Sequence, residues 1–495
     1  MTDDARTISL KHPNSLFIGG DWIASSSGAT SDVIDSASEA VIATVAHADA
    51  ADVDKAVTAA RRAFDEGEWP RLSHAERAVY LRAIAAAILR RGDEFARSWT
   101  LESGILYRIA SERLAGIMAG RFSVHADMAE TFAFEEPHRA SGGQAATLVR
   151  EPVGVVAAIV PWNSPAALAT YKCAPALLAG CTIVLKIPPE APTSGYLLAE
   201  IFEEVGLPAG VVNVVAASRE GSKALVSDPR VDKVTFTGST AVGRDIASTL
   251  GDRIGRYTLE LGGKSPAIVL GDFDLADAAR TLASGISMLS GQVCHSLTRI
   301  VVPRPRHDAM VEALAAELGA MRVGDPFDPS SDLGPLSSER HRDSVERYIE
   351  IGQAEGARLV LGGGRPAHLD RGYYVEPTLF ADVDNSSTIG QEEIFGPVLS
   401  VIAAADDDDA IRIANDTIFG LNATIFTNDD ERFQHLARRI RAGTVGQNGS
   451  RTDVGIAFGG YKQSGVGREG GVDGLLPFLE TKLLVSDRPH RAQSA

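Results

Sequence analysis

The sequence predicts an α/β fold built around parallel β-sheets, and two observations support this prediction. From residue 147 onward, apolar runs of strand length alternate with segments of helical periodicity. The apolar runs, such as VGVVAAIV at 153–160, are continuous rather than alternating, which is typical of strands buried on both faces. Because parallel strands are joined by crossover connections that are usually helices, the pattern favours a nucleotide-binding type of architecture.

Two amphipathic helices are expected before this region, over residues 52–64 and 74–97. In the second, an apolar face that includes Val79 and Leu89 is followed by Gly92 as a stop signal. The first α/β series then has expected strands at 153–160, 182–186, 211–215, 233–237 and 256–261, and expected helices at 166–179 and 193–205.

A second α/β series of similar size follows, so the sequence indicates two domains with a boundary near 262–270. Its expected strands are 298–303, 357–363, 396–404, 422–427 and 443–448, and its expected helices are 307–321, 338–355, 406–416 and 429–441. The acidic run Asp406–Asp409 is interpreted as a helix N-terminus, where acids favour the dipole, and no metal site is expected.

Composition narrows the class of protein. The chain has 495 residues, with 48 Lys and Arg against 65 Asp and Glu, a formal net charge of −17. Hydrophobic residues make up 44%, as in globular proteins, and the negative charge argues against nucleic acid and anionic membranes as partners. Three cysteines are too few for a disulfide framework and favour a reducing, cytoplasmic compartment. Residues 1–20 lack a signal-peptide pattern, and no apolar stretch reaches the roughly 18 residues of a membrane span.

Two glycine-rich motifs look like nucleotide-binding signatures but lack the required context. Gly465–Gly470 matches G-x-G-x-x-G without a preceding apolar strand, and Gly262–Ser265 resembles the end of a P-loop without its first glycine. The turn at Gly238, Ser239 and Thr240 is a better candidate, because it joins an apolar strand to a helix whose free N–H groups suit a pyrophosphate. An ordinary capped strand–helix turn would have the same sequence.

Cys294 is the candidate nucleophile among the three cysteines. Cys173 and Cys181 lie in an apolar, alanine-rich segment typical of inert packing residues. Cys294 lies in the small, polar run SGQVCHS, where it is either an accessible thiol or a structural one. Glu260 ends an apolar strand beside two glycines, and is a candidate general base or a surface carboxylate. Asn163 ends another strand and offers an amide donor to an oxyanion.

Seven motifs, in this order, resemble those of the NAD(P)-dependent aldehyde dehydrogenase superfamily, in its non-acylating, hydrolytic type. The resemblance spans nearly the whole chain, from FIGGDW at 17–22 to LETKLL at 479–484. The matching motifs are PWN (161–163), LK with a proline-rich turn (185–189), FTGSTAVG (236–243), LELGGKSP (259–266), GQVC (291–294), EEIFGPV (392–398) and FGGYKQSGVGRE (458–469).

The resemblance implies a Rossmann-like parallel-sheet cofactor domain, a second α/β catalytic domain and a small bridging β arm. On this basis the NAD(P)-binding domain comprises 1–131 and 153–262, the catalytic domain 263–463, and the arm and C-terminal tail 132–152 and 464–495. The stretch 132–152 has hairpin character and resembles the arm that pairs with another subunit, so a homodimer or homotetramer is implied.

The resemblance also implies a reaction. Cys294 would attack the carbon of a small-molecule aldehyde, Asn163 and the Cys294 N–H would hold the oxyanion, and hydride transfer to NAD(P)⁺ would leave a thioester. Glu260 would then activate water to release a carboxylic acid. The alternatives are a CoA-acylating semialdehyde dehydrogenase, whose kind generally lacks the acid at position 260, and a non-catalytic structural protein on the same scaffold, whose kind tends to have lost the cysteine or its partners.

Cofactor and substrate residues follow from the same motifs. Pro189 stands where many members have a glutamate that binds the adenosine ribose, and Glu190 comes one position later. No lysine or arginine follows closely to bind a phosphate, so NAD is expected, with NADP possible. The expected cofactor-binding residues are Trp162, Lys186, Gly238, Ser239, Glu393 and Phe395. The expected lining of the aldehyde pocket, partly polar and suited to an oxygenated or aromatic aldehyde, is Ser164, Tyr171, Val293, His295, Arg451, Thr452 and Phe458.

Overall fold

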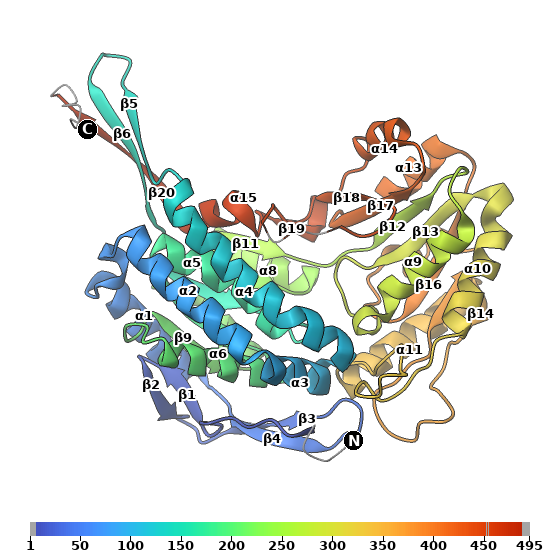
Figure 1. Cartoon of the computed structure of the whole chain (residues 1–495), viewed down its shortest axis with the longest axis horizontal. Coiled ribbons are helices and arrows are strands. Elements are labelled where there is room, and N and C mark those ends of the chain that lie inside the picture. Colours follow the sequence, from blue (N-terminus) through green and yellow to red (C-terminus); the bar gives the residue numbers. More distant parts are fainter. Residues whose placement is uncertain (1–5, 452, 454, 488–495) are drawn as a thin grey trace.

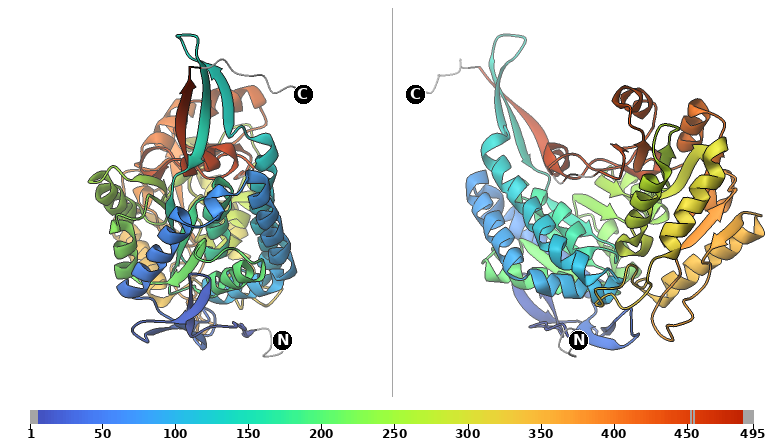
Figure 2. Two further views of the ribbon diagram at one scale, coloured as in Figure 1. Left: turned by 90° about the vertical axis from the view of Figure 1, so that its left-hand side faces the viewer. Right: turned by 45° about the vertical axis from the view of Figure 1, so that its right-hand side comes forward.

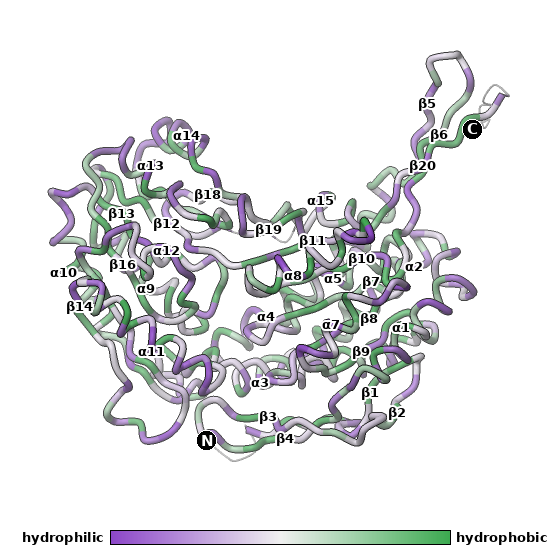
Figure 3. The backbone as a smooth tube through the Cα atoms, turned by 180° about the vertical axis from the view of Figure 1, so that it is seen from behind, coloured by the Kyte–Doolittle hydropathy of each residue, from purple (hydrophilic) through white to green (hydrophobic). Residues whose placement is uncertain are grey.

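The computed structural model describes residues 6–451, 453 and 455–487. Two large β-sheets lie side by side with helices on their faces, and a narrow β arm projects away from both (Figures 1 and 2). Hydrophobic segments concentrate in the strands and inner helices, while the outer helices and loops are more hydrophilic (Figure 3). The predicted α/β class is confirmed.

The first sheet consists of β1 (Ser15–Ile18), β2 (Asp21–Ala24), β7 (Val155–Ile159), β8 (Thr182–Ile187), β9 (Val212–Ala216), β10 (Lys233–Thr237), β11 (Arg256–Glu260) and β19 (Gly465–Val466). Their order is β19-β11-β10-β7-β8-β9-β1-β2. The five central strands are parallel, as the continuous apolar runs predict. Antiparallel strands at both edges were not predicted, because β1, β2 and β19 are short.

Helices cover both faces of this sheet. One face carries α2 (His74–Arg90), α3 (Gly92–Ser103), α4 (Tyr107–Thr131), α5 (Pro165–Ala179) and α6 (Thr193–Glu204), and the other carries α1 (Ala50–Asp65), α7 (Arg219–Ser227) and α8 (Thr240–Gly251). Alternate side chains of β7 point to opposite faces of the sheet. Val156 and Ala158 pack in the hydrophobic core under α2–α6, and Val155 and Ala157 pack in the core under α1, α7 and α8.

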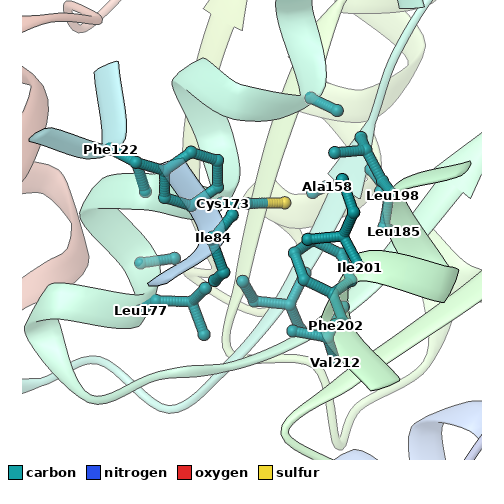
Figure 4. Packing of buried hydrophobic residues seen from close by; sticks show 14 of the residues in the cluster. Ile84, Phe122, Ala158, Cys173, Leu177, Leu185, Leu198, Ile201, Phe202 and Val212 are labelled. Carbon is teal, nitrogen blue, oxygen red and sulfur yellow. The ribbon is translucent and has the colours of Figure 1, made fainter. Parts of the chain in front are cut away.

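The larger core explains the predicted packing role of Cys173. Its thiol lies among Phe122, Leu177 and Phe202, and the residue is 1% exposed (Figure 4). Cys181 is also fully buried. Both cysteines therefore behave as small apolar side chains.

The second sheet consists of β12 (Ser265–Val269), β13 (Leu297–Pro303), β14 (Arg358–Leu361), β15 (Thr378–Ala381), β16 (Val398–Ala404), β17 (Asn422–Phe426) and β18 (Thr444–Gln447). The order is β14-β15-β16-β13-β12-β17-β18, and only β14 pairs antiparallel. One face packs on α9 (Leu275–Ser287) and α10 (His307–Gly319), and the other on α11 (Glu339–Ala354), α12 (Thr388–Gln391), α13 (Asp407–Asn415) and α14 (Asp430–Ala437).

The arm is a three-stranded antiparallel sheet of β5 (Glu135–Arg139), β6 (Ala145–Pro152) and β20 (Leu479–Ser486), with β6 in the centre. The tail strand β20 pairs with β6 of its own chain along its whole length. Within the described residues, neither β5 nor β20 pairs with a further strand, so each forms an edge of the arm.

Several elements differ from the sequence prediction. The helix expected over 74–97 is two helices that meet at Arg91, so Gly92 begins α3 instead of ending a helix, and Val79 and Leu89 are exposed rather than on a buried face. The 25-residue helix α4 was not predicted.

None of the described helices combines the length and apolar character needed to cross a membrane. The remaining elements are β3 (Thr30–Ile34), β4 (Val41–Ala46), α15 (Gly471–Leu475) and the 3₁₀ helices η2 (Trp69–Arg71), η3 (Met288–Gly291), η4 (Arg304–Arg306), η5 (Lys462–Ser464) and η6 (Leu476–Phe478).

Candidate active site

A cavity of about 640 Å³ has walls from both large sheets. The first sheet contributes the segments that follow the carboxyl ends of β7, β10 and β11, where α/β proteins form their sites. The second contributes the loop before β13 and side chains from 341–348 and 393–395. The predicted site residues that line it are Asn163, Glu260, Cys294, Trp162, Gly238, Ser239, Glu393, Phe395, Ser164, Tyr171, Val293, His295 and Phe458.

Two predicted site residues are not among those that line this cavity, and a third lies outside the described residues. Lys186 is buried at the end of β8, where burial lowers its pKa to about 8 against the opposing effect of Glu190. Arg451 is exposed on the loop after β18. Thr452 is the residue outside the described part of the chain.

The loop that carries Cys294 has an unusual backbone. After α9, Leu289, Ser290 and Gly291 all have left-handed φ values, of 54°, 53° and 74°. The Ser290 hydroxyl donates to the Gly334 carbonyl oxygen at 2.7 Å, and a Cβ at position 291 would lie 2.2 Å from the Gly396 carbonyl oxygen. Such a conformation persists only where the surroundings impose it, and it brings the half-buried Cys294 to the cavity wall.

Hydrogen bonds to neighbouring loops and helices fix the position of Asn163. Its side-chain amide donates to the Gln292 carbonyl oxygen at 2.9 Å, which links it to the Cys294 loop. The Trp99 indole donates to the Asn163 carbonyl oxygen at 2.6 Å, and the Gln292 side chain donates to the Ser103 carbonyl oxygen at 3.1 Å. Since an amide has two N–H groups, the second one of Asn163 stays available to a ligand. Sequence reasoning missed Trp99 and Gln292, because only the tertiary contact reveals them.

The cavity raises the pKa of the Cys294 thiol. Burial is the main cause, and the carboxylates of Glu393 and Glu260 add to it, while the backbone N–H groups of Cys294 and His295 act in the opposite direction. A thiolate here therefore needs an added positive charge or a high pH to form.

Glu260 is a buried carboxyl group without a hydrogen-bond partner. It ends β11, is 3% exposed, and neither carboxyl oxygen has a partner within the described residues. Burial and the nearby carboxylate of Glu469 raise its pKa well above the usual range, against Lys172 and Arg468. A Cβ at Gly459 would lie 2.6 Å from its Oε1, so the glycine leaves room for this side chain. A carboxyl group with a raised pKa is suited to general-base chemistry near neutral pH.

Behind Glu260 lies a buried ion pair that sequence reasoning missed. Lys172 Nζ lies 2.6 Å from Glu469 Oε1, and the two side chains are 0% and 4% exposed. The ammonium also donates to the Thr237 hydroxyl at 2.7 Å, while Oε2 of Glu469 has no partner within the described residues. A lysine within the otherwise small and apolar run YKCAPALLAG was the signal available, because a buried lysine needs a charged partner.

Glu393 and Phe395, in the segment between α12 and β16, also line the cavity. Glu393 Oε1 accepts the Gly263 N–H at 3.1 Å, and burial raises its pKa to about 7. Phe395 has a φ of 61°, and its carbonyl oxygen lies 2.7 Å from His341 Nε2. The rings of Trp162 and His341 are 4.8 Å apart, and burial lowers the His341 pKa to about 4, so this histidine is neutral. His341 was not predicted.

The Gly238–Ser239 turn forms the N-terminus of α8. Ser239 is the N-cap, and its hydroxyl accepts from the Val242 N–H. A Cβ at Gly238 would lie 2.4 Å from the Phe236 ring, so a larger residue here would have to displace that ring. Free N–H groups at a helix N-terminus on a cavity wall suit a phosphate group, and the residues present fit a dinucleotide.

The other end of the cavity is mostly apolar. The rings of Tyr171 and Phe458 stack at 6.4 Å, and the His295 ring meets Phe458 at 6.2 Å. Burial lowers the pKa of His295, which favours a neutral lining residue. The α4 side of this end is formed by Ile109, Arg113, Leu114, Ile117 and Arg121.

Comparison with known proteins gives consistent matches along the chain. A family model described as "Aldehyde dehydrogenase family" matches residues 22–484. A geranial dehydrogenase from Castellaniella defragrans is 45% identical over 469 residues, which cover 95% of this chain and 97% of that protein. A Mycobacterium tuberculosis aldehyde dehydrogenase solved with NAD⁺ is 45% identical with a TM-score of 0.94, covering 97% and 99% of the two chains. A Pseudomonas syringae aldehyde dehydrogenase variant solved with NAD⁺ and octanal is 39% identical with a TM-score of 0.94, covering 98% and 100%.

Proposed function

The chain belongs to the aldehyde dehydrogenase family, and we propose that Cys294, Asn163 and Glu260 carry out its oxidation of an aldehyde to a carboxylic acid with NAD⁺. One observation supports this most: a single cavity holds a thiol, an amide donor and a buried carboxyl group, next to a helix N-terminus. A nucleophile, an oxyanion donor and a base are the groups that this covalent chemistry needs.

In the proposed reaction, Cys294 first loses its thiol proton to solvent. The resulting thiolate attacks the aldehyde carbon, and the carbonyl oxygen becomes an oxyanion. The second side-chain N–H of Asn163 and the backbone N–H of Cys294 donate to that oxygen, which stabilises the charge as it develops. Bound NAD⁺ supplies the hydride acceptor. Loss of the hydride leaves a thioester on Cys294, and Glu260 removes a proton from the water that hydrolyses it.

We infer that the cofactor pyrophosphate lies against the Gly238–Ser239 turn. Glu393 would hold the nicotinamide ribose, Phe395 would pack near the nicotinamide, and Lys186 would hold the adenosine ribose. No lysine or arginine occurs between positions 187 and 218 to bind a 2′-phosphate, and both solved relatives above contain NAD⁺, so NAD is the cofactor.

The wild-type protein should reduce NAD⁺ when an aldehyde is added and should form one carboxylic acid per NADH. Asn163→Ala should lower kcat by about 100- to 1000-fold, the loss typical of removing one oxyanion donor. NADH absorbance with acid quantification measures both results. Asn163→Asp is the matched variant: it keeps the shape but replaces the donor with an acceptor, so it should lose at least as much. Activity of Asn163→Ala within threefold of wild type contradicts the role.

Alkylation of Cys294 in the cofactor-free protein should be slow at neutral pH and should accelerate above the ordinary thiol range. The thiolate is the reactive form, and the raised pKa keeps the thiol protonated until the pH passes it. Glu393→Gln removes one of the charges that raise this pKa, so the acceleration should move to lower pH. Iodoacetamide kinetics followed by intact mass measure the shift, with the buried Cys173 and Cys181 as unreactive internal controls. An identical profile in Glu393→Gln contradicts the electrostatic cause.

We also propose that the arm joins subunits into a homodimer or homotetramer. β20 exposes apolar side chains at 483–485, and an open apolar edge favours pairing with another chain.

The proposed cofactor domain is 1–131 with 153–262, and the proposed catalytic domain is 263–463. The proposed compartment is the cytoplasm, whose reducing conditions would keep Cys294 a thiol.

A further inference from the structure

Arg121 is a buried cation on the wall of the active-site cavity. The proposed reaction gives it no role. It lies in α4, is 6% exposed and lines the apolar end of the cavity. Its guanidinium stacks on the Tyr171 ring, with 3.3 Å between Cζ and the ring centroid. Nη1 donates to the Ala167 carbonyl oxygen and, at 3.1 Å, to the Thr170 hydroxyl. These contacts with α5 fix the position of the charge.

Arg121 lacks an acidic partner within the described residues, since no carboxylate oxygen there lies within 4 Å of it. Nε is buried without a hydrogen-bond partner within the described residues, and the Tyr171 side chain is the other polar neighbour of the guanidinium. A buried charge without an ion pair is unfavourable, because burial removes hydration that nothing replaces. Burial lowers the pKa of this guanidinium, while the side chains of Tyr171 and Glu469 act in the opposite direction.

The other buried charges beside this end of the cavity balance without Arg121. Lys172 and Glu469 form an ion pair, and the raised pKa of Glu260 favours its neutral form. While Glu260 is protonated, Arg121 therefore gives the site one net positive charge, which a single carboxylate on a ligand would balance. Three further α4 side chains that line the same cavity, Ile109, Leu114 and Ile117, suit a hydrocarbon chain.

We propose that Arg121 binds a carboxylate carried by the aldehyde substrate, so that the substrate class is an oxo acid with a short hydrocarbon chain between its two ends. The inference rests on the proposed aldehyde oxidation at Cys294. Nη2 would donate to carboxylate oxygens, and the rigid guanidinium plane would orient the aldehyde end toward the nucleophile. One relative is a geranial dehydrogenase and another was solved with octanal, and both aldehydes are uncharged. The substrate proposed for this chain differs from these two aldehydes in carrying a carboxylate.

The test compares three matched series with the wild-type enzyme and NAD⁺: ω-oxo acids of four to eight carbons, their methyl esters, and alkanals of the same length. The best oxo acid should exceed its methyl ester in kcat/KM by about 10- to 100-fold, the value of a hydrogen-bonded charge pair. Arg121→Met, which keeps much of the side-chain volume, should remove this preference, because kcat/KM should fall by about 10- to 100-fold more for the oxo acid than for the alkanal. Arg82→Met, on the outer surface of α2, is the matched control and should retain the preference.

Two results would overturn the inference: wild-type enzyme that favours the ester or alkanal at every length, or an Arg121→Met variant that loses all substrates equally, as a purely structural arginine would. The wild-type comparison decides the matter alone if Arg121→Met does not fold, and Arg121→Lys then serves as the second variant, with partial retention expected. Failure of the wild-type enzyme to oxidise any of the three series would instead contradict the proposed function.

Discussion

Replacing Cys294 with alanine should abolish aldehyde-dependent reduction of NAD⁺, with a loss of the order of 10⁵- to 10⁶-fold, as when a covalent nucleophile is removed. No other described cysteine can substitute, because Cys173 and Cys181 are buried in the core of the first sheet. The variant should still bind NADH, since the proposed cofactor contacts come from other residues. Stopped-flow and steady-state NADH absorbance measure the loss, and NADH fluorescence measures binding.

Cys173→Ala provides the matched control for Cys294→Ala. Its thiol packs against aromatic and aliphatic side chains, so the substitution should lower stability by roughly 1 kcal/mol and leave kcat within about twofold (Figure 4). Turnover above about 1% of wild type in Cys294→Ala would exclude the thiol as nucleophile. Loss of activity in Cys173→Ala with an unchanged melting temperature would show that the cysteine assignment is incomplete.

The parallel strands could be predicted because burial on both faces produces a continuous apolar run. KVTFT at 233–237 is observed as a strand with the predicted bounds, and all five of its residues are buried. The long helix α4 escaped prediction because Arg121 and His125 lie on its buried side, where polar residues interrupt the apolar periodicity. Arg121, which interrupts this periodicity, is also the residue whose position suggests a ligand.

The candidate site could be predicted where its residues follow strand ends and glycine turns, as Asn163 and Glu260 do. The contacts between such segments could not be predicted from the sequence. Lys172 and Glu469 are 297 positions apart, and neither shows its partner in local sequence. Arg451, which its position in the sequence places on or near the aldehyde pocket, is exposed and is not among the described residues that line the cavity.

Glu260→Gln should convert the enzyme into one that completes a single turnover and then stalls. The side chain keeps its shape but cannot accept a proton from water, so the thioester on Cys294 should accumulate. We expect a burst of about one NADH per active site, followed by a steady rate about 100- to 10⁴-fold below wild type. Intact mass spectrometry should detect the acyl group on the protein. Full steady-state hydrolysis would exclude Glu260 as the base, and a rate restored by added CoA would favour acyl transfer.

Glu469→Gln tests the electrostatic setting of the same base. In the wild-type protein the neighbouring carboxylate raises the pKa of Glu260, and Lys172 lowers it. The substitution removes the first effect and leaves the second, so the pKa of Glu260 should fall. Because the base works as a carboxylate, hydrolysis is active above this pKa and is lost as the pH falls through it. The acidic limb of the deacylation rate should therefore move to lower pH in Glu469→Gln, whereas a shift to higher pH would show that Glu260 is governed by a different neighbour.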